Sequence, residues 1–204
     1  MNRYYPVYLD LKDKKCVVVG GGKVAERKVT RLLESQAKVV VVSPDLTPGL
    51  DELRKRGEIE HQARSYQEDD LEEAFLVISA ADKRDVNERV SREACGKTLL
   101  VNVVDAPELS NCFVPSIVRR GDLLISISTG GIAPGLAKRI RTDLERLYGK
   151  EYDEYLKILA QFREKVKEKH EDQAERYLAW QRILDSDLLE RIRKGETVSV
   201  EEFV

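Results

Sequence analysis

The chain has 204 residues, 35 lysines and arginines against 37 aspartates and glutamates, and a formal net charge of -2. Because the charges balance, no overall positive field attracts nucleic acid or a membrane surface, and we expect neither as a partner. Residues 1–11 lack the apolar core of a secretory leader, and the three cysteines form no C-x-x-C pair. We therefore expect a cytoplasmic protein, and the sequence carries no signature of a metal site.

The most informative segment is residues 16–33, CVVVGGGKVAERKVTRLL. Four apolar residues lead into Gly20, and the spacing from Gly20 through Gly22 to Ala25 reads G-x-G-x-x-A. In a dinucleotide site the first glycine allows a tight turn, the second lets a pyrophosphate approach the backbone, and the small third residue lets the helix pack on the strand. The free N–H groups at the start of that helix face the phosphates. The segment predicts a nucleotide site between a strand at 15–19 and a helix.

Strands that alternate with helices through residue 104 predict an α/β fold with a doubly wound, Rossmann-like parallel sheet. Continuous apolar runs are typical of strands buried on both faces of such a sheet, and apolar spacings of three and four predict helices. We expect an extended lead-in at residues 1–10. The elements expected after the first strand and helix are strands at 37–42, 58–63, 76–80 and 98–104 and helices at 69–75 and 85–95.

The pattern changes after residue 112. Residues 113–118 and 123–128 read as two strands, and the Arg-Arg-Gly-Asp segment between them predicts a hairpin. A second glycine turn then leads into a helix with one apolar stripe, and the chain after Gly149 is almost entirely helical in pattern. We predict a nucleotide-binding domain at 1–112, a small α+β region at 113–148 and a helical C-terminal domain at 149–204.

The strand ends supply candidate contacts for a nucleotide. Ligands of an open α/β sheet bind outside the carboxyl ends of its strands, where an acidic residue about 20 positions after the glycines holds a ribose hydroxyl. Here the second strand ends in Ser43, with Asp45 two residues on. Either can hold the ribose, and Asp45 has the alternative role of a turn residue after Pro44. No arginine follows to hold a 2′-phosphate, which favours NAD over NADP. Ala81, after the strand at 76–80, is a further candidate contact.

Asp105 is the candidate general base. It follows the apolar run 98–104, so it lies at the mouth of a buried strand, where a carboxylate suits acid–base chemistry. A cap or turn role for Asp105 is the alternative. Asn102, three residues earlier, either contacts a substrate or satisfies neighbouring backbone.

The second glycine turn offers a candidate anion site. Ser128, Thr129, Gly130 and Gly131 precede a helix whose N-terminus can bind an anion, and an N-cap is the alternative role. Basic residues near this turn in the sequence are candidate partners for an anionic substrate. They are Arg119, Arg120, Lys138, Arg139 and Arg141.

Three segments of the chain resemble the precorrin-2 dehydrogenase family, the N-terminal module of siroheme synthases that is often coupled to sirohydrochlorin ferrochelatase activity. They are VVVGGGKVAERKVTRLL at 17–33, VNVVDAPELSNCFVPSIV at 101–118 and STGGIAPGLAKRIR at 128–141. The resemblance implies a Rossmann domain, a dimerisation region and a helical C-terminal domain. It further implies a homodimer that uses NAD⁺ to oxidise precorrin-2, a polycarboxylate tetrapyrrole, to sirohydrochlorin.

The resemblance also implies site residues. Asp105 matches the aspartate that the family uses in catalysis, and Ser128 and Thr129 occupy a turn that lies near the tetrapyrrole. Members commonly have a serine where this chain has Ala133, before Pro134. The implied dinucleotide contacts are Gly20, Gly22, Lys23, Val24, Ser43, Pro44 and Asp45.

Two alternative functions stay open. One is a bifunctional enzyme that also inserts Fe²⁺ into sirohydrochlorin. The other is a regulatory module that senses NAD and NADH and signals through its charged helices. Such a sensor needs only the glycine turn at 20–22 and leaves the segments around Asp105 and 128–131 unexplained.

Overall fold

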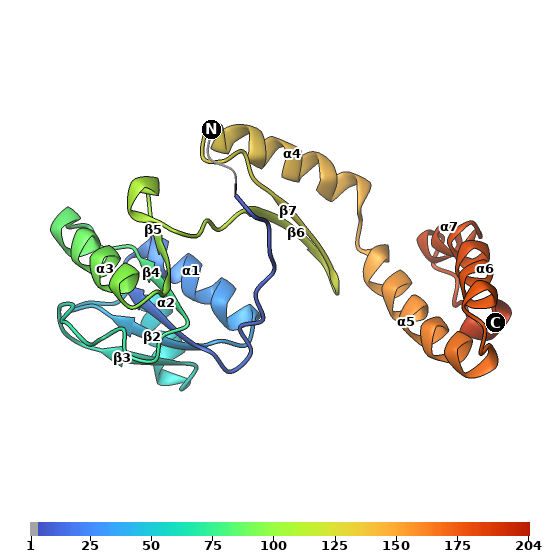
Figure 1. Cartoon of the computed structure of the whole chain (residues 1–204), viewed down its shortest axis with the longest axis horizontal. Helices are drawn as coiled ribbons and strands as arrows, with labels where there is room; N and C mark the ends of the chain where they lie inside the picture. The colour runs from blue at the N-terminus through green and yellow to red at the C-terminus, as the bar shows by residue number, and fades with distance from the viewer. Residues whose placement is uncertain (1–3) are drawn as a thin grey trace. The chain divides into compact units, whose positions relative to one another are not determined.

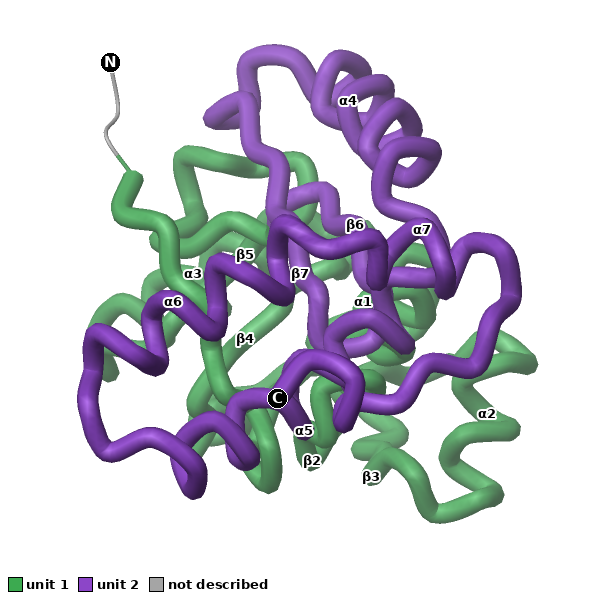
Figure 2. Tube along the Cα trace, turned by 90° about the vertical axis from the view of Figure 1, so that its right-hand side faces the viewer, with its two compact units in different colours: residues 1–114 green, residues 115–204 purple. Residues whose placement is uncertain are grey.

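The computed structural model describes residues 4–204 (Figure 1). The chain divides into two units, one that ends at Val114 and one that runs from Pro115 to Val204 (Figure 2). Of the lead-in predicted at 1–10, residues 1–3 lie outside the described part of the chain, and residues 4–10 contain no helix or strand. No helix among the described residues is long and apolar enough to cross a membrane.

A five-stranded parallel sheet in the order β3-β2-β1-β4-β5 forms the centre of the first unit (Figure 1). The unit's elements are β1 (Lys15–Val19), α1 (Lys23–Glu34), β2 (Lys38–Val42), α2 (Pro48–Lys55), β3 (Ile59–Gln62), β4 (Leu76–Ser79), α3 (Arg84–Gly96), β5 (Leu100–Val103) and η1 (Pro107–Leu109). All of β4, and β1 from Cys16 onward, is buried, as their continuous apolar runs predict.

Helices cover both faces of this sheet. Ala25 and Val29 of α1 and Leu50 of α2 join the core on one face, and Val90 and Ala94 of α3 join the core on the other. Because the crossovers place helices on both sides, the predicted doubly wound, Rossmann-like fold is confirmed.

The helix predicted at 69–75 is wrong, because residues 68–73 form turns instead. Asp69 and Glu73 have φ angles of 76° and 57°, and this left-handed backbone cannot continue a right-handed helix. The bidentate pair of Arg64 with Asp70, at 2.8 and 2.6 Å, fixes the crossover from β3 to β4 in place of a helix.

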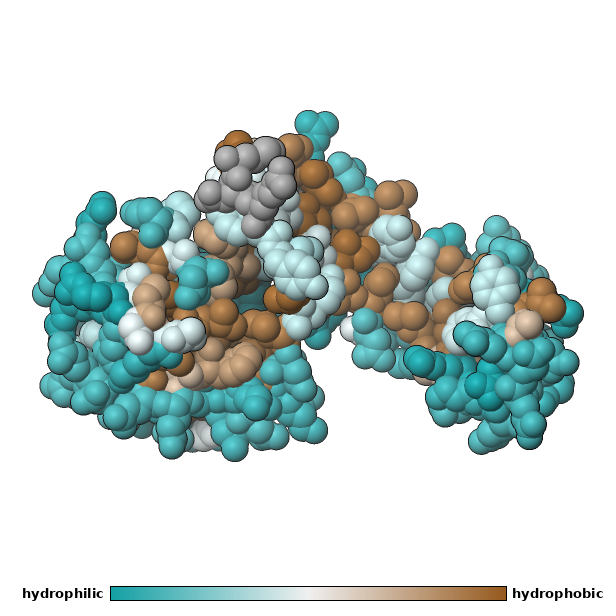
Figure 3. All heavy atoms as spheres, viewed as in Figure 1, coloured by the Kyte–Doolittle hydropathy of each residue, from teal (hydrophilic) through white to brown (hydrophobic). Residues whose placement is uncertain are grey.

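The second unit begins with a hairpin and continues with helices. Its elements are β6 (Ser116–Arg120), β7 (Leu123–Ile127), α4 (Pro134–Leu147), α5 (Glu151–Lys169), α6 (Gln173–Leu184), α7 (Leu188–Arg193) and η2 (Val200–Glu202). The predicted hairpin is present as an antiparallel pair, although its first strand begins at Ser116 rather than at residue 113. Gly121 lies in its turn with φ 56°. Apolar side chains gather over the hairpin and α4 (Figure 3).

A separate apolar core holds the C-terminal helices together. Phe162 of α5 is completely buried in it, and the ring of Trp180 on α6 meets Phe162 edge-on at a centroid distance of 5.3 Å. Trp180 is the single tryptophan of the chain. Its fluorescence therefore reports on this core alone.

Replacement of Phe162 by Ala should lower the free energy of unfolding of this core by about 3–5 kcal/mol, because it removes a buried ring and leaves a cavity. Denaturant unfolding followed by Trp180 fluorescence measures the loss as a lower midpoint. The control is Leu178→Ala on the exposed side of α6, which should change the free energy by less than about 0.5 kcal/mol. Equal shifts for the two variants would contradict the assignment of this core.

Candidate functional site

The glycine turn at residues 20–22 joins β1 to α1 at the carboxyl edge of the sheet. Gly20 has φ 119°, and its N–H donates to the carbonyl oxygen of Val42 at 2.9 Å. A Cβ at Gly20 would overlap the carbonyl oxygen of Ala80 and lie 3.3 Å from the backbone nitrogen of Ala81. Both the left-handed backbone and this close approach require glycine here. The same contact brings Ala81 beside the turn.

Gly21, which the motif leaves variable, packs against the loop after β2. A Cβ at Gly21 would overlap the carbonyl oxygen of Asp45 and lie 2.8 Å from Oγ of Ser43. The carbonyl oxygen of Gly21 accepts a hydrogen bond from the N–H of Thr47 at 3.0 Å. Gly22 differs, because a Cβ there would have no atom of the described residues 4–204 within 4 Å apart from its chain neighbours. The turn is therefore closed at Gly21 and open at Gly22, where the motif expects a pyrophosphate.

The start of α1 suits an anion. Gly22 is its N-cap and no side chain of residues 4–204 caps it, so the first N–H groups of the helix remain available for a phosphate. Lys23 is exposed and Val24 partly buried. Ala25 is completely buried, which meets the need for a small residue between helix and strand. The described residues fit a dinucleotide at this turn.

The two candidate ribose contacts after β2, Ser43 and Asp45, differ in how exposed they are. Ser43 is 8% exposed and lies beneath Gly21, and its carbonyl oxygen accepts a hydrogen bond from Nε2 of His61 at 2.8 Å. Pro44 and Asp45 are exposed. The cap of the next helix is Thr47, whose Oγ1 accepts from the N–H of Leu50 at 3.4 Å. The exposed carboxylate of Asp45 is therefore more accessible to a ribose than the Ser43 hydroxyl is.

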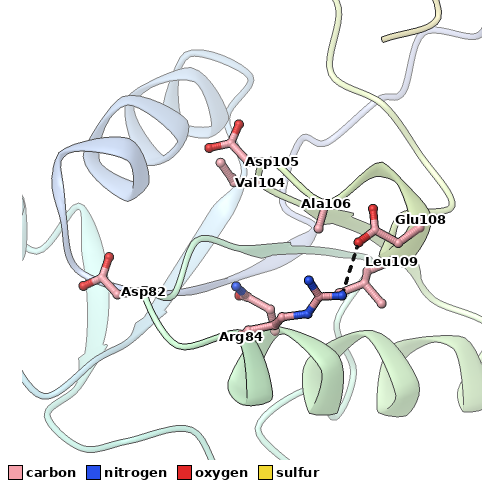
Figure 4. Close-up of a pocket in the computed structure, with 8 residues that line it drawn as sticks. Asp82, Arg84, Val104, Asp105, Ala106, Glu108 and Leu109 are labelled. Atoms are coloured by element: carbon pink, nitrogen blue, oxygen red, sulfur yellow. Dashed lines mark ion pairs between the residues drawn. The ribbon is translucent and has the colours of Figure 1, made fainter. Parts of the chain in front are cut away.

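Asp105 lies at the same edge of the sheet, after β5. Its φ of 57° is left-handed, which is strained for a residue other than glycine and is a frequent feature of functional sites. The side chain is exposed and points toward α1 (Figure 4). A pocket of about 170 Å³ adjoins it. The lining residues are Asp82, Arg84, Asn87, Val104, Asp105, Ala106, Glu108 and Leu109.

Two asparagines fix the backbone around this pocket. Asn102 is buried, and its Nδ2 donates to the carbonyl oxygen of Cys112 at 3.0 Å, so it satisfies neighbouring backbone. Asn87 receives a hydrogen bond from Ser79 at 2.6 Å and donates to the carbonyl oxygen of Ala81 at 2.9 Å. The role of Asn87 was not predicted from the sequence, because nothing in the residues around it indicates that a polar side chain one turn into α3 bonds to the end of β4 and the loop after it.

The second glycine turn belongs to the second unit and precedes α4. The Ser128 hydroxyl oxygen accepts a hydrogen bond from the N–H of Gly130 at 3.1 Å, and the Thr129 hydroxyl oxygen accepts one from the N–H of Ala133 at 3.2 Å. Gly130 and Gly131 have φ angles of 62° and 82°. These four residues build a tight turn whose two hydroxyl hydrogens can still donate to a ligand.

Two of the predicted cationic partners are bonded to oxygen atoms of the chain itself. Nε of Arg120 donates to the carbonyl oxygen of Tyr148 at 2.9 Å and thereby binds the C-terminal end of α4, and Arg141 pairs with Glu145. Proximity in sequence was misleading for Arg120, which lies at the hairpin tip and not at the end that leads to residue 128. Among residues 4–204, no three His, Cys, Asp or Glu side chains gather in a set able to hold a metal ion.

Three family models match consecutive parts of the chain. A putative NAD(P)-binding family matches residues 7–116, which is more than half of the chain. The sirohaem biosynthesis protein central region matches residues 120–147, and the sirohaem synthase dimerisation region matches residues 151–203.

Curated relatives and a solved structure agree with these models. The siroheme synthase of Methylobacillus flagellatus is 42% identical over 94% of this chain and 41% of the relative. The siroheme synthase of Thioalkalivibrio sulfidiphilus is 38% identical, and the match covers 94% of this chain and 39% of that relative. The chain thus spans about two fifths of these relatives. A solved structure described as "SirC, precorrin-2 dehydrogenase" is 28% identical, covers 98% of this chain and 96% of its own, and has a TM-score of 0.82.

Replacement of Gly21 by Ala should both destabilise the first unit and weaken nucleotide binding, because the new methyl group displaces the backbone of Asp45. We expect a loss of about 1–3 kcal/mol in the free energy of unfolding. Gly22→Ala enters open space and should cost less than about 1 kcal/mol, while its methyl group still obstructs a pyrophosphate. Denaturant unfolding and titration with NADH fluorescence measure the two effects. A Gly22→Ala variant with unchanged NADH affinity would contradict the placement of the pyrophosphate.

With Ala133 at the N-cap, no side chain in the described part of the protein caps α4. Ala133→Ser should stabilise the helix by about 1 kcal/mol, since a serine oxygen at the N-cap accepts an N–H of the first turn. Chemical unfolding followed by circular dichroism measures the gain. Ala133→Val adds volume without an acceptor and should give no gain, so equal stabilisation by the two would reject the capping explanation.

Proposed function

Because the chain belongs to the NAD(P)-binding siroheme synthase family that these three models describe, we propose that it oxidises precorrin-2 to sirohydrochlorin with NAD⁺. The observation that carries the proposal is the position of two features on one sheet. The open glycine turn follows β1 and Asp105 follows β5, with only β4 between these strands. All of them end at the same edge of a parallel sheet, so a dinucleotide and a carboxylate face one region.

The reaction removes a hydride and a proton from two atoms of the substrate and yields sirohydrochlorin, NADH and a proton. NAD⁺, when bound, supplies the hydride acceptor. The Asp105 carboxylate accepts the proton that leaves with the new double bond. The uncapped start of α1 binds the pyrophosphate, and Gly22 leaves room for it. The proposed cofactor contacts are Gly20, Gly22, Lys23, Val24, Ser43, Pro44, Asp45 and Ala81.

The proposed substrate contacts are Asn102 and the four residues of the second glycine turn. Asn102 contributes by holding the carbonyl group of Cys112 in place. Ser128, Thr129, Gly130 and Gly131 supply hydroxyl and backbone donors to carboxylates of the tetrapyrrole. Polar donors are suited to such a substrate because each carboxylate needs a hydrogen-bond or cationic partner when it leaves water.

We further propose a cytoplasmic homodimer, divided into domains at 1–112, 113–148 and 149–204. Large apolar side chains on and beside α4 are exposed in the single chain, among them Ile132 at 85% and Leu147 at 63%. A two-stranded sheet such as β6–β7 is marginal alone, so a second copy that covers this region would stabilise it. The match to a dimerisation region at 151–203, C-terminal to α4, also supports a homodimer.

Asp105→Asn tests the proposed base, because the amide keeps the shape of the side chain but cannot take the proton. In an anaerobic absorbance assay with precorrin-2 and NAD⁺, we expect kcat to fall about 100-fold or more and the affinity for NAD⁺ to stay unchanged. The control is Asp85→Asn, an exposed carboxylate at the start of α3, which should keep full activity. Full activity of Asp105→Asn would reject the base, and a wild-type protein that makes no sirohydrochlorin would reject the function.

A further inference from the structure

Lys28 on α1 differs from the other partly buried cations of the protein. Within residues 4–204, eight lysines and arginines are partly buried, and the side chains of seven donate hydrogen bonds to carbonyl or carboxylate oxygens. The Lys28 ammonium makes no hydrogen bond and no ion pair with the described residues. A partly buried cation without a bonded anion is unfavourable unless a ligand supplies one.

The surroundings of Lys28 connect it to the proposed base. Asp105 points toward α1 (Figure 4), and the negative charge of its carboxylate acts to raise the pKa of Lys28. The Cys112 side chain also lies close enough to Lys28 for the two groups to influence each other's pKa. Asn102 ties this segment to β5 through its hydrogen bond to the Cys112 carbonyl oxygen. Lys28, Asn102, Asp105 and Cys112 therefore form one cluster between α1 and the end of β5.

The charges in this cluster leave Lys28 short of negative charge. Burial lowers the pKa of Lys28, and repulsion from Arg31 and Arg27 on the same helix lowers it further. The negative charge of Asp105 acts to raise this pKa, but the net shift is still downward. Burial raises the pKa of the Cys112 thiol to about 11, so this group is neutral near pH 7 and does not serve as a counter-ion. A second carboxylate at Lys28 would form a charge-assisted hydrogen bond.

We propose that Lys28 binds one carboxylate group of the tetrapyrrole substrate and so anchors the substrate beside Asp105. The inference rests on the proposed function, which supplies a polycarboxylate substrate. In this role the ammonium donates hydrogen bonds to the substrate carboxylate and takes no part in proton transfer. Lys28 therefore determines substrate affinity, whereas Asp105 determines the rate of the chemical step.

Lys28→Met and Lys28→Arg test this role, because methionine keeps the apolar stem and arginine keeps the charge. For Lys28→Met we expect the KM for precorrin-2 to rise at least about tenfold, which corresponds to the loss of one charge-assisted bond. The kcat and the KM for NAD⁺ should change less than about twofold. Lys28→Arg should recover most of the substrate affinity. The matched control is Arg31→Met, an exposed cation on the same helix, which should leave the KM for precorrin-2 within about twofold of wild type.

Two kinetic results would overturn the proposal. They are an unchanged KM for precorrin-2 in Lys28→Met, and a fall in kcat at constant KM, which would mean that Lys28 acts through Asp105. Thermal unfolding of each variant establishes that it is folded, and Lys28→Gln, which also removes the charge and should raise the KM for precorrin-2 in the same way, provides the test if the methionine variant is not. A wild-type protein without turnover would reject the proposed function, and equilibrium binding of sirohydrochlorin would then decide. Binding that Lys28→Met weakens about tenfold supports the carboxylate site, while equal binding or no binding by wild type rejects it.

Discussion

The close backbone packing of the glycine turn is the constraint on which the nucleotide site depends. Gly20 and Gly21 bring the backbone of β1 against the ends of two other strands, where a Cβ would overlap the carbonyl oxygens of Ala80 and Asp45. These contacts fix the turn from two sides and leave it open only at Gly22. Because the open position coincides with the uncapped start of α1, the most closely packed part of the loop also orients the N–H groups that an anion needs.

The chemistry at the sheet edge follows from how charge is distributed there. Most partly buried cations of the chain are bonded to protein oxygens and serve the fold, as Arg120 does at the end of α4. Lys28 and Asp105 are different, since the Lys28 ammonium has no hydrogen bond or ion pair within residues 4–204 and Asp105 is exposed on a left-handed backbone. Groups that the fold leaves unsatisfied are those that a substrate can use.

Sequence patterns predicted the elements that depend on local chemistry. The spacing of Gly20, Gly22 and Ala25 predicted the turn between β1 and α1, and the apolar run before Asp105 predicted a buried strand that ends there. The parallel sheet followed from the order of strands and helices. Contacts between segments that are far apart in the sequence produce no local pattern, so the packing of Gly21 against the loop after β2 was not predicted. The helix predicted at 69–75 is absent, because the local sequence does not reveal the left-handed backbone at Asp69 and Glu73 that breaks it.

The most direct test of hydride transfer at this sheet edge is the stoichiometry of a single anaerobic turnover of wild-type protein. NADH and sirohydrochlorin are quantified together after precorrin-2 is mixed with enzyme and NAD⁺. If the glycine turn holds the hydride acceptor and Asp105 takes the proton, the two products form in equal amounts and at the same rate. Sirohydrochlorin that forms equally fast without NAD⁺, or without an equal amount of NADH, would contradict this mechanism.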